Sequence, residues 1–316
     1  MPFVKIIEQA INRRKHLFHS SDTNAFRLFN GSGDDCEGLI IDFYNGFVLL
    51  QLYDSSLYND YPHICEHLKR ILALINIQVN GILLKDRSKV NDPQQIAQIR
   101  KSTLVDGNLP PDNFSITQNN IAAYVDLIHG QNTGVFLDMR TVRKRMLNYY
   151  KNGGKLCNLF SYTGLFSVHA LKNGLQYAVN VDISQTVLNR AKQNYILNDI
   201  KYDSRDFVKM DCKQYLKKLI KQKAHYDFVI FDPPTFSRNK KQNFSVKTHY
   251  RDYLSLIEYI AQGGLVLTTI NAVSISARDY MSLHPNHWKL ELLEHEPEDF
   301  PYKSQPYLKA GLWKIP

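Results

Sequence analysis

The second half of the sequence predicts an α/β fold built on a mainly parallel sheet. Apolar runs alternate there with segments of helical periodicity, and the runs cover residues 156–160, 177–181, 205–210 and 226–231. Each run is followed by a polar residue or a turn. Because parallel strands bring their carboxyl ends to one edge of a sheet, where open α/β folds bind ligands, we expect these polar residues to share a site.

The fourth of these runs ends in the sequence Asp232-Pro233-Pro234-Thr235-Phe236. Proline cannot donate to a strand ladder or continue a helical turn, so two prolines in succession keep the chain extended. An extended loop at this edge could hold a flat substrate beside a cofactor. The simpler interpretation is a turn that only ends the strand. The order of the preceding motifs favours a site.

The first strand and the second strand carry the next motifs. Ser161-Tyr162-Thr163-Gly164 follows the first strand and opens a helix predicted over 165–172. Asp182 ends the second strand, 18 residues after Gly164. That spacing suits a carboxylate that accepts hydrogen bonds from the two hydroxyls of a ribose.

The composition indicates which kinds of partner and which cellular compartment to expect. The chain has 316 residues, with 39 Lys and Arg against 30 Asp and Glu, and a net charge of +9 favours a polyanionic partner. Four scattered cysteines show no metal-ligand spacing, and the start is not signal-like, so we expect reduced thiols, no metal and a cytoplasmic protein. No apolar run reaches the roughly 20 residues that cross a bilayer, so no membrane partner is expected.

The length suggests two domains, which we place at residues 1–115 and 116–316. The first reads as a small α+β module with helices at 1–18 and 63–75, strands at 26–29, 38–42, 47–52 and 81–85, and an irregular stretch at 87–113. Asn45-Gly46 between two apolar runs predicts a hairpin. The cluster Arg13-Arg14-Lys15 is either a solvated helix face or a contact for RNA.

The remainder of the second domain continues the alternation. Asn239-Lys-Lys-Gln-Asn243 reads as a basic loop. The expected order after it is a helix at 246–261, a strand at 265–269, a helix at 276–283 and strands at 289–295 and 308–314. The last strands add an antiparallel end to the sheet.

Five motifs in this order resemble those of the S-adenosylmethionine-dependent ribosomal RNA large-subunit methyltransferases I and K. They are Thr133-Gly-Val-Phe-Leu-Asp-Met-Arg140, Asn158-Leu-Phe-Ser-Tyr-Thr-Gly164, Asp182-Ile-Ser184, Asp211-Cys212 and Asp232-Pro-Pro-Thr-Phe-Ser237. The resemblance runs from about Arg13 to the C-terminus. It implies a seven-stranded, Rossmann-like class I methyltransferase domain preceded by a small α+β domain that handles the RNA substrate.

The resemblance also implies roles for particular residues and S-adenosylmethionine as the cofactor. The expected cofactor-binding residues are Phe136, Asp138, Arg140, Asn158, Phe160, Ser161, Tyr162, Thr163, Gly164, Asp182, Ile183, Ser184, Asp211, Cys212 and Asp232. The expected catalytic residues are Asp232, Pro233, Pro234, Phe236 and Asn271. Gly164 is the sole glycine of the first turn, which disfavours the phosphates of a dinucleotide or ATP but not a cofactor without phosphate.

The expected acceptor follows from a missing thiol. Methyltransferase I enzymes that make 5-methylcytosine carry a cysteine in the loop after the fifth strand, whereas Thr268-Thr-Ile-Asn-Ala-Val-Ser274 has none. Methyltransferase K, which methylates guanine N7, has asparagine there, so a guanine of 23S ribosomal RNA is the first expectation. Phe236 is expected to stack on the base or pack beside it, and the simpler interpretation of Phe236 is packing within the loop. Alternatives are an exocyclic amine, another RNA base, a protein or small molecule, or a catalytically silent ribosome-binding module.

Other polar residues receive simpler interpretations. Arg143-Lys144-Arg145 reads as a solvated helix face that could touch phosphate, and His129 and His249 as structural rather than as bases. Cys157 reads as core. The resemblance does not extend to the N-terminal RNA-binding domain of methyltransferase I or to the partner domain fused to some methyltransferases K, so we expect neither. RNA affinity is therefore expected from the small domain, the basic surface or a ribosomal assembly particle.

Overall fold

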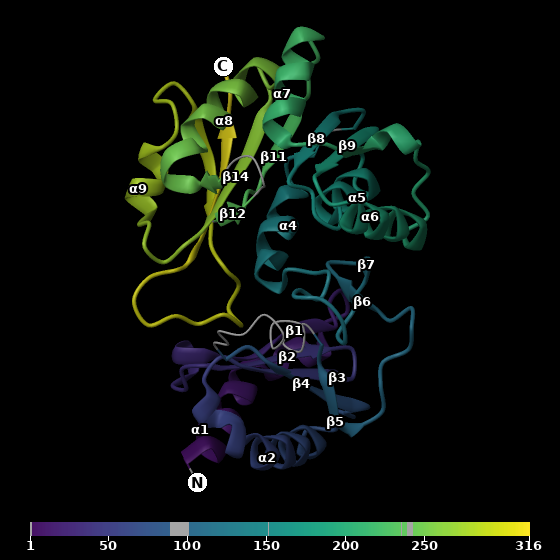
Figure 1. The fold of residues 1–316 in the computed structure, drawn as a ribbon, viewed down its shortest axis with the longest axis vertical. Helices are drawn as coiled ribbons and strands as arrows, with labels where there is room; N and C mark the ends of the chain where they lie inside the picture. The colour runs from purple at the N-terminus through teal and green to yellow at the C-terminus, as the bar shows by residue number, and fades with distance from the viewer. Residues whose placement is uncertain (1, 89–100, 151, 235, 239–242) are drawn as a thin grey trace. The chain divides into compact units, whose positions relative to one another are not determined.

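A computed structural model describes residues 2–88, 101–150, 152–234, 236–238 and 243–316. The chain forms two compact units (Figure 1). Unit 1 comprises Met1–Asp138 and Pro297–Ser304, and unit 2 comprises Met139–Glu296 and Gln305–Pro316. This division differs from the expected boundary after residue 115, because β6 (Ser115–Gln118) and β7 (Ile121–Tyr124) belong to unit 1. The short segment Pro297–Ser304 gave no sign in the sequence of belonging to the first unit.

Unit 1 is built on a five-stranded sheet in the order β1-β2-β3-β4-β5. The strands are β1 (Ala25–Asn30), β2 (Leu39–Tyr44), β3 (Phe47–Leu52), β4 (Gly81–Asp86) and β5 (Thr103–Gly107). The predicted hairpin is confirmed: β2 pairs antiparallel with β3, and Asn45 and Gly46 have φ of 43° and 89°. β5 was not expected, since its residues are exposed or half-buried and lack an apolar pattern.

Among the described residues of unit 1, helices α1 (Pro2–Arg14) and α2 (Tyr61–Leu74) cover one face of this sheet. Alternate residues of the strands, including Phe26, Ile41 and Val48, form one core with residues of α1 and α2. A 3₁₀ turn at Lys15–His19 continues α1. The predicted helices at 1–18 and 63–75 are therefore confirmed, with the amphipathic face of each directed to the core.

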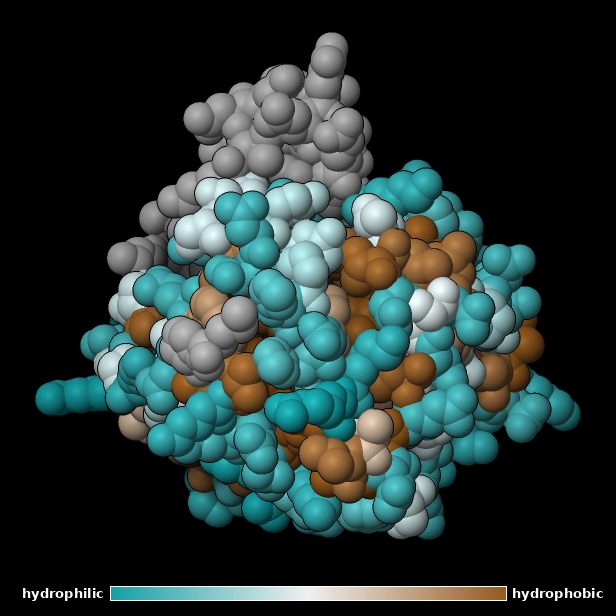
Figure 2. Space-filling model, turned by 90° about the horizontal axis from the view of Figure 1, so that it is seen from below, coloured by the Kyte–Doolittle hydropathy of each residue, from teal (hydrophilic) through white to brown (hydrophobic). Residues whose placement is uncertain are grey.

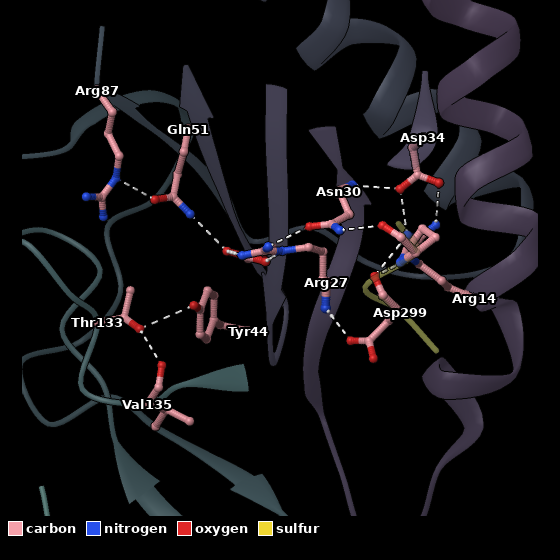
Figure 3. Close-up of polar contacts among 12 residues, drawn as sticks. Arg14, Arg27, Asn30, Asp34, Tyr44, Gln51, Arg87, Thr133, Val135 and Asp299 are labelled. Atoms are coloured by element: carbon pink, nitrogen blue, oxygen red, sulfur yellow. Dashed lines mark hydrogen bonds and ion pairs between the residues drawn. The ribbon is translucent and has the colours of Figure 1, made fainter. Parts of the chain in front are cut away.

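A buried ion pair corrects the interpretation of Arg13-Arg14-Lys15 as one exposed cluster. Arg13 and Lys15 are exposed, but only 1% of the Arg14 surface is accessible. The Arg14 Nη2 atom lies 2.6 Å from Oδ2 of Asp34, whose side chain is fully buried (Figure 3). Asp34 also accepts a hydrogen bond from the Asn30 backbone N–H. Arg14 is thus a structural cation of unit 1, whereas Arg13, which also pairs with Asp34, and Lys15 keep exposed side chains.

The same arginine holds the segment Pro297–Ser304 within unit 1. Arg14 donates to the carbonyl of Asp299 at 2.9 Å, and the Arg27 backbone N–H donates to the Asp299 carboxylate at 2.8 Å (Figure 3). The Arg27 guanidinium lies 4.2 Å from the centre of the Phe300 ring. A Cβ on Gly33 would stand 1.9 Å from the Pro301 carbonyl oxygen, so this close approach requires glycine.

A row of polar side chains continues from Arg27 across the sheet of unit 1. Arg27 pairs with Asp42, Gln51 donates to Asp42 at 2.9 Å, and Arg87 donates to Gln51 at 2.7 Å (Figure 3). Lys85, on the neighbouring strand, is fully buried and donates to the Gly130 carbonyl at 2.8 Å. The buried polar groups of this row are therefore hydrogen-bonded, as a packed interior requires.

Unit 2 contains the expected seven-stranded sheet, in the order β10-β9-β8-β11-β14-β16-β15. Its strands are β8 (Lys155–Leu159), β9 (Tyr177–Asp182), β10 (Phe207–Lys209), β11 (Phe228–Phe231), β14 (Leu265–Asn271), β15 (Lys289–Glu294) and β16 (Leu308–Lys314). The first five are parallel, and β16 is antiparallel to both β14 and β15. The predicted α/β architecture with an antiparallel end is confirmed.

Helices cover both faces of this sheet (Figure 1). One core joins the sheet to α4 (Arg140–Met146) and α5 (Leu165–Lys172), and a second joins it to α7 (Cys212–Lys221), α8 (Val246–Ile260) and α9 (Ala277–Ser282). α6 (Gln185–Leu197) lies beside β9 and β10, and a short hairpin pairs β12 (Phe236–Arg238) with β13 (Asn243–Ser245). Arg143 is buried against the Phe166 ring, which corrects its assignment to a solvated face.

The visible face in Figure 2 is mainly hydrophilic, with hydrophobic residues in small separate groups. Within the part of the chain that the structure describes, none of the helices combines the length and apolar character needed to span a bilayer.

The buried pair predicts a large stability effect for Asp34→Ala. Without Asp34, the Arg14 guanidinium stays buried without its carboxylate, which should lower the free energy of unfolding by about 3–5 kcal/mol. Urea denaturation of the whole chain measures this change. Lys303→Ala is the control, because Lys303 forms an exposed pair with Asp35 and should cost at most about 1 kcal/mol. Equal effects of the two changes would contradict the assigned role of Arg14.

Candidate functional site

The parallel strands of unit 2 bring five chain segments to one edge of the sheet. β11 lies between β8 and β14, with Phe231 paired to Leu159 on one side and to Thr268 on the other. The segments that follow β8, β9, β10, β11 and β14 therefore leave the sheet at the same edge. Three of them contain the predicted site residues Phe160, Asp211 and Asp232, while the predicted site residues Asp182 and Asn271 are the last residues of β9 and β14.

The turn after β8 owes its shape to left-handed backbone conformations. Phe160, Tyr162 and Gly164 have φ of 55°, 49° and 74°. The Ser161 N–H donates to Val181 of the neighbouring strand at 3.0 Å, and the Gly164 N–H donates to the Ser161 carbonyl at 2.9 Å. Non-glycine residues adopt such conformations at an energetic cost, so their succession here is a feature of functional loops.

Gly164 is required by space as well as by conformation. A Cβ at this position would lie 3.0 Å from the Ala191 Cβ and 3.1 Å from the Asn180 side-chain oxygen. The start of α5 can therefore approach α6 only with glycine at this position. The lone glycine of the first turn thus serves helix packing and turn conformation together.

Asp182 closes the turn from the second strand. Its carboxylate accepts a hydrogen bond from the Tyr162 N–H at 3.1 Å and another from the Ser184 N–H at 2.9 Å. Burial raises the pKa of this carboxyl group, and the backbone N–H donors of Ser184, Tyr162 and Ile183 oppose that shift. Each oxygen retains a second lone pair for a ligand hydroxyl. The arrangement fits the predicted role toward a ribose.

Ile183 and Ser184 follow this carboxylate at the start of α6. Ser184 is the N-cap residue, and its hydroxyl accepts from the Val187 N–H at 3.5 Å. Ile183 is 45% exposed and so presents apolar surface beside this polar turn. An apolar surface next to a ribose-type carboxylate could cover one face of a purine ring.

Ser161 supplies a further observation that tests whether a cofactor fits. Its side chain is buried, and its hydroxyl has no hydrogen-bond partner among the described residues. An unsatisfied buried hydroxyl is costly unless a ligand or water completes it. Together with Asp182 and Ile183, it forms a set of donors, acceptors and apolar surface that fits a nucleoside such as that of S-adenosylmethionine.

Several predicted contact residues lie beneath the turn rather than at its surface. Asn158 is 1% exposed and donates to the Ser167 hydroxyl at 3.0 Å, and Asn194 donates to the Thr163 carbonyl at 2.9 Å. These bonds join β8, α5 and α6 under the turn. Direct contact of Asn158 or Thr163 with a cofactor stays a prediction, while their structural role is visible.

Asp211 and Cys212 lie where α7 begins, and Cys212 connects this point to the ends of β8 and β9. Asp211 caps α7 by accepting from the Gln214 N–H at 3.0 Å. The Cys212 thiol is buried, accepts from the Phe160 N–H at 3.3 Å and donates weakly to the Val181 carbonyl at 3.9 Å. Burial raises the pKa of Cys212 well above its usual value. Their contact with an adenine ring stays a prediction.

The end of β11 carries the proposed substrate side of the site. The Thr269 hydroxyl on β14 donates a hydrogen bond to the Asp232 carboxylate, and Tyr250 donates to the Thr269 carbonyl at 3.2 Å. Pro233 is buried and Pro234 is exposed. The sequence did not single out Thr269; the only available signal was its position opposite Asp232 in the expected strand order.

Aromatic rings pack together at the same edge of the sheet, where β8 and β11 end. Tyr253 of α8 stacks on Phe231 with ring centres 5.2 Å apart, and Phe160 lies 5.8 Å from Tyr253. These contacts fix the ends of β8 and β11 side by side. The Phe236 backbone lies in β12, whereas its side chain, Thr235 and residues 239–242 lie outside the described part of the structure.

The motif that begins at Thr133 straddles the division between the units. Phe136, which is 40% exposed, and the buried Asp138 belong to the end of unit 1. Arg140 begins α4 in unit 2 and is buried. The contribution of these three residues to a cofactor pocket stays a prediction.

Asp182 generates a binding prediction. A hydrogen bond to a charged group contributes about 1.5–3 kcal/mol, so Asp182→Ala should weaken S-adenosylmethionine binding by roughly 10- to 150-fold in calorimetry. Because protonation removes acceptor capacity, affinity should fall as the pH falls through the raised pKa of Asp182. Asp203→Ala, at an exposed site of unit 2, is the matched control. Unchanged affinity in Asp182→Ala would remove this residue from the site.

Comparisons with known proteins agree with this geometry. A family model described as S-adenosylmethionine-dependent methyltransferase matches residues 26–312. YwbD of Bacillus subtilis strain 168, provisionally named a ribosomal RNA large subunit methyltransferase, is 31% identical over 279 residues, which cover 88% of this chain and 68% of YwbD. Ribosomal RNA large subunit methyltransferase I of Yersinia pseudotuberculosis serotype O:1b is 33% identical over 267 residues, which cover 84% of this chain and 65% of that protein.

A solved structure extends the agreement to three dimensions. SMU.776, provisionally described as a methyltransferase and complexed with SAH, superposes with a TM-score of 0.88 at 29% identity, covering 99% of this chain and 81% of SMU.776. The expected fold and the expected cofactor, S-adenosylmethionine, are thereby confirmed. The chain belongs to the S-adenosylmethionine-dependent methyltransferase family.

Proposed function

We propose that this enzyme methylates a base of large-subunit ribosomal RNA and that the acceptor atom is N7 of a guanine. The names of the two relatives support the class of substrate, and the net charge of +9 suits a polyanion. The observation that carries the choice of atom is the segment after β14. It begins after Asn271, the last residue of β14, and contains no cysteine, and Thr269 of the same strand donates a hydrogen bond to Asp232 at the end of β11.

For this reaction the main task of the protein is to position the cofactor and the base relative to each other. S-adenosylmethionine supplies an electrophilic methyl group when bound. Guanine N7 has a lone pair in the plane of the ring, so no proton has to be removed before it attacks. In the proposal, Asp182 and Ser161 orient the cofactor, while Asp232, Pro233 and Pro234 orient the base. Alignment of two reactants in this way supplies much of a catalytic rate enhancement.

The state of the thiols supports a route without a covalent RNA adduct. Cys157 and Cys212 are buried, and burial raises the pKa of each well above its usual range. Burial also raises the pKa of Cys65 to about 11 and that of the half-buried Cys36. A nucleophilic cysteine needs the thiolate form, which all four environments disfavour.

Methylation of an exocyclic amine is the second candidate. The Asp232 carboxylate could accept amine hydrogens at this edge, and this favours the alternative. Against it, Thr235 rather than an aromatic residue follows the second proline. The presence of Asp182, Asp211 and Asp232 at the ends of three parallel strands argues against a catalytically silent module.

Unit 1 is the part of the chain to which we assign the RNA substrate. Lys15 is exposed directly after α1 and suits a phosphate contact, and the exposed Arg13 could add one although it also pairs with Asp34; Arg14 between them has a structural role. The partner is either free ribosomal RNA or a ribosomal assembly particle, and both present the same phosphate chemistry.

The identity of the product is the principal test. Ribosomal RNA from cells without this protein, incubated with the enzyme and labelled cofactor, should yield 7-methylguanosine in nucleoside mass spectrometry. Binding should weaken steeply as salt rises, because phosphate contacts release counterions. Label in 5-methylcytosine or only in protein would refute the proposal. Label in an N2- or N6-methylated base would support the amine alternative.

The thiol argument gives a separate expectation. Replacing each of the four cysteines by alanine should leave methyl transfer within about one order of magnitude, because the reaction would not pass through a thioether. Thermal unfolding of each variant controls for the loss of a buried side chain at Cys65, Cys157 or Cys212. An adduct with 5-fluorocytosine RNA that resists denaturation, and that one cysteine change abolishes, would overturn the expectation.

A further inference from the structure

Lys309 of β16 is a cation in the interior of unit 2. Its side chain is fully buried, although the residue lies in a strand whose neighbours Leu308, Ala310 and Leu312 are apolar. Burial lowers the pKa of Lys309, and attraction to Glu296 opposes this shift. A buried ammonium is costly compared with an apolar side chain of the same size, so its hydrogen bonds indicate what it does.

The ammonium of Lys309 bonds to the backbone just beyond the end of β14. Its Nζ atom donates to the Ala272 carbonyl at 2.9 Å and to the Pro306 carbonyl at 2.7 Å. The ladder between β14 and β16 ends at the pair Asn271 and Leu308. Lys309 therefore extends hydrogen bonding from the regular sheet into the segment that follows Asn271.

Two further bonds hold the same segment. The Ala272 N–H donates to the Tyr307 carbonyl at 2.8 Å, and the Gln305 side chain donates to the Val273 carbonyl. Val273 is 53% exposed even though its backbone is held in this way. A segment with a fixed backbone and an exposed apolar side chain presents a defined surface rather than a mobile loop.

Glu296 holds the start of β16 and the residue before it. Its carboxylate accepts from the Tyr307 N–H at 3.0 Å and from the Leu308 N–H at 3.1 Å. The stretch 305–309 is thus held by the Glu296 carboxylate at the backbone N–H groups of Tyr307 and Leu308, and it bonds to Ala272 through the Lys309 ammonium. The two opposite charges act on the same stretch, and their attraction reduces the cost of burying each.

We propose that Lys309 is a positioning residue that fixes residues 271–273, the acceptor segment, at the edge of the sheet where β14 ends. This inference rests on the proposed function, in which the segment after β14 belongs to the substrate side of the site. Lys309 does not touch the reacting atoms. It acts by keeping the segment after β14 in one conformation, so that the base meets a preformed surface at the edge of the sheet.

The test compares Lys309→Met with Lys314→Met. Methionine keeps the length and apolar stem of lysine and removes the charge. Lys314 lies on the same strand, but it is exposed and bonds to Gly263 at the opposite end. Two readouts are needed: hydrogen exchange of the backbone amides in 271–275, and kcat against KM for RNA together with calorimetric affinity for S-adenosylmethionine.

In Lys309→Met, exchange of the Ala272 amide should accelerate by about tenfold or more, and kcat should fall by a similar factor, since two hydrogen bonds to a charge are lost. Cofactor affinity should stay within about threefold, and Lys314→Met should match the parent. Unchanged exchange or an unchanged kcat in Lys309→Met would overturn the proposal. If Lys309→Met does not fold, Lys309→Gln, which keeps one donor group, should show an intermediate effect.

The two readouts also separate this inference from the proposed function. Hydrogen exchange needs no substrate, so it decides whether Lys309 holds the acceptor segment even if the acceptor is not RNA. Absence of methyl transfer to RNA by the parent would refute the proposed function alone. Normal transfer by the parent, combined with fast exchange and undiminished kcat in Lys309→Met, would refute the positioning role alone.

Discussion

The candidate site depends on the register of β11 between its two parallel neighbours. Phe231 pairs with Leu159 and with Thr268, so the next residue of each strand stands in one row at the sheet edge. The Thr269 hydroxyl can reach Asp232 only in this register. A slip of one residue would direct the side chains of β11 to the opposite faces of the sheet and separate the cofactor side from the substrate side.

Both units use a buried cation where regular secondary structure stops. Arg14 bonds to Asp34 and to the Asp299 carbonyl, and Lys309 bonds to the carbonyls of Ala272 and Pro306. Hydrophobic packing is not directional, whereas a charged donor fixes carbonyl groups at defined positions. The segments held in this way have no ladder of their own, which explains why a desolvated charge is tolerated at each place.

Much of this fold follows from patterns that are local in sequence. The apolar runs of β8, β9, β11 and β16 and the Asn45-Gly46 hairpin could be predicted, because burial and turn conformation leave a direct trace in residue type. β5 could not, since a strand with an exposed or half-buried face has no apolar alternation. The burial of Arg14 and Arg143 could not either, because their partners lie far away in the sequence.

The residues of the candidate site also divide into those that the sequence predicted and those that only the strand pairing reveals. Asp182, Gly164 and Asp232 stand out in the sequence, because a carboxylate or glycine directly after a predicted strand is typical of a ligand-binding turn. Thr269 and Lys309 support the site from strands where threonine and lysine suggest nothing by themselves. Their roles arise from the pairing of β14 with β11 and β16, which a single sequence does not specify beyond the expected order.

Unit 1 is completed by residues that come close to the end of the chain. Asp299, Phe300 and Pro301 fill positions against Arg14, Arg27 and Gly33, although nearly three hundred residues separate the two groups. During translation, the amino-terminal sheet and helices emerge from the ribosome long before these partners exist. Until residues 299–301 are synthesised, Arg14 and Arg27 can already pair with Asp34 and Asp42, but the Asp299 acceptors, the Phe300 ring and the Pro301 contact with Gly33 are missing.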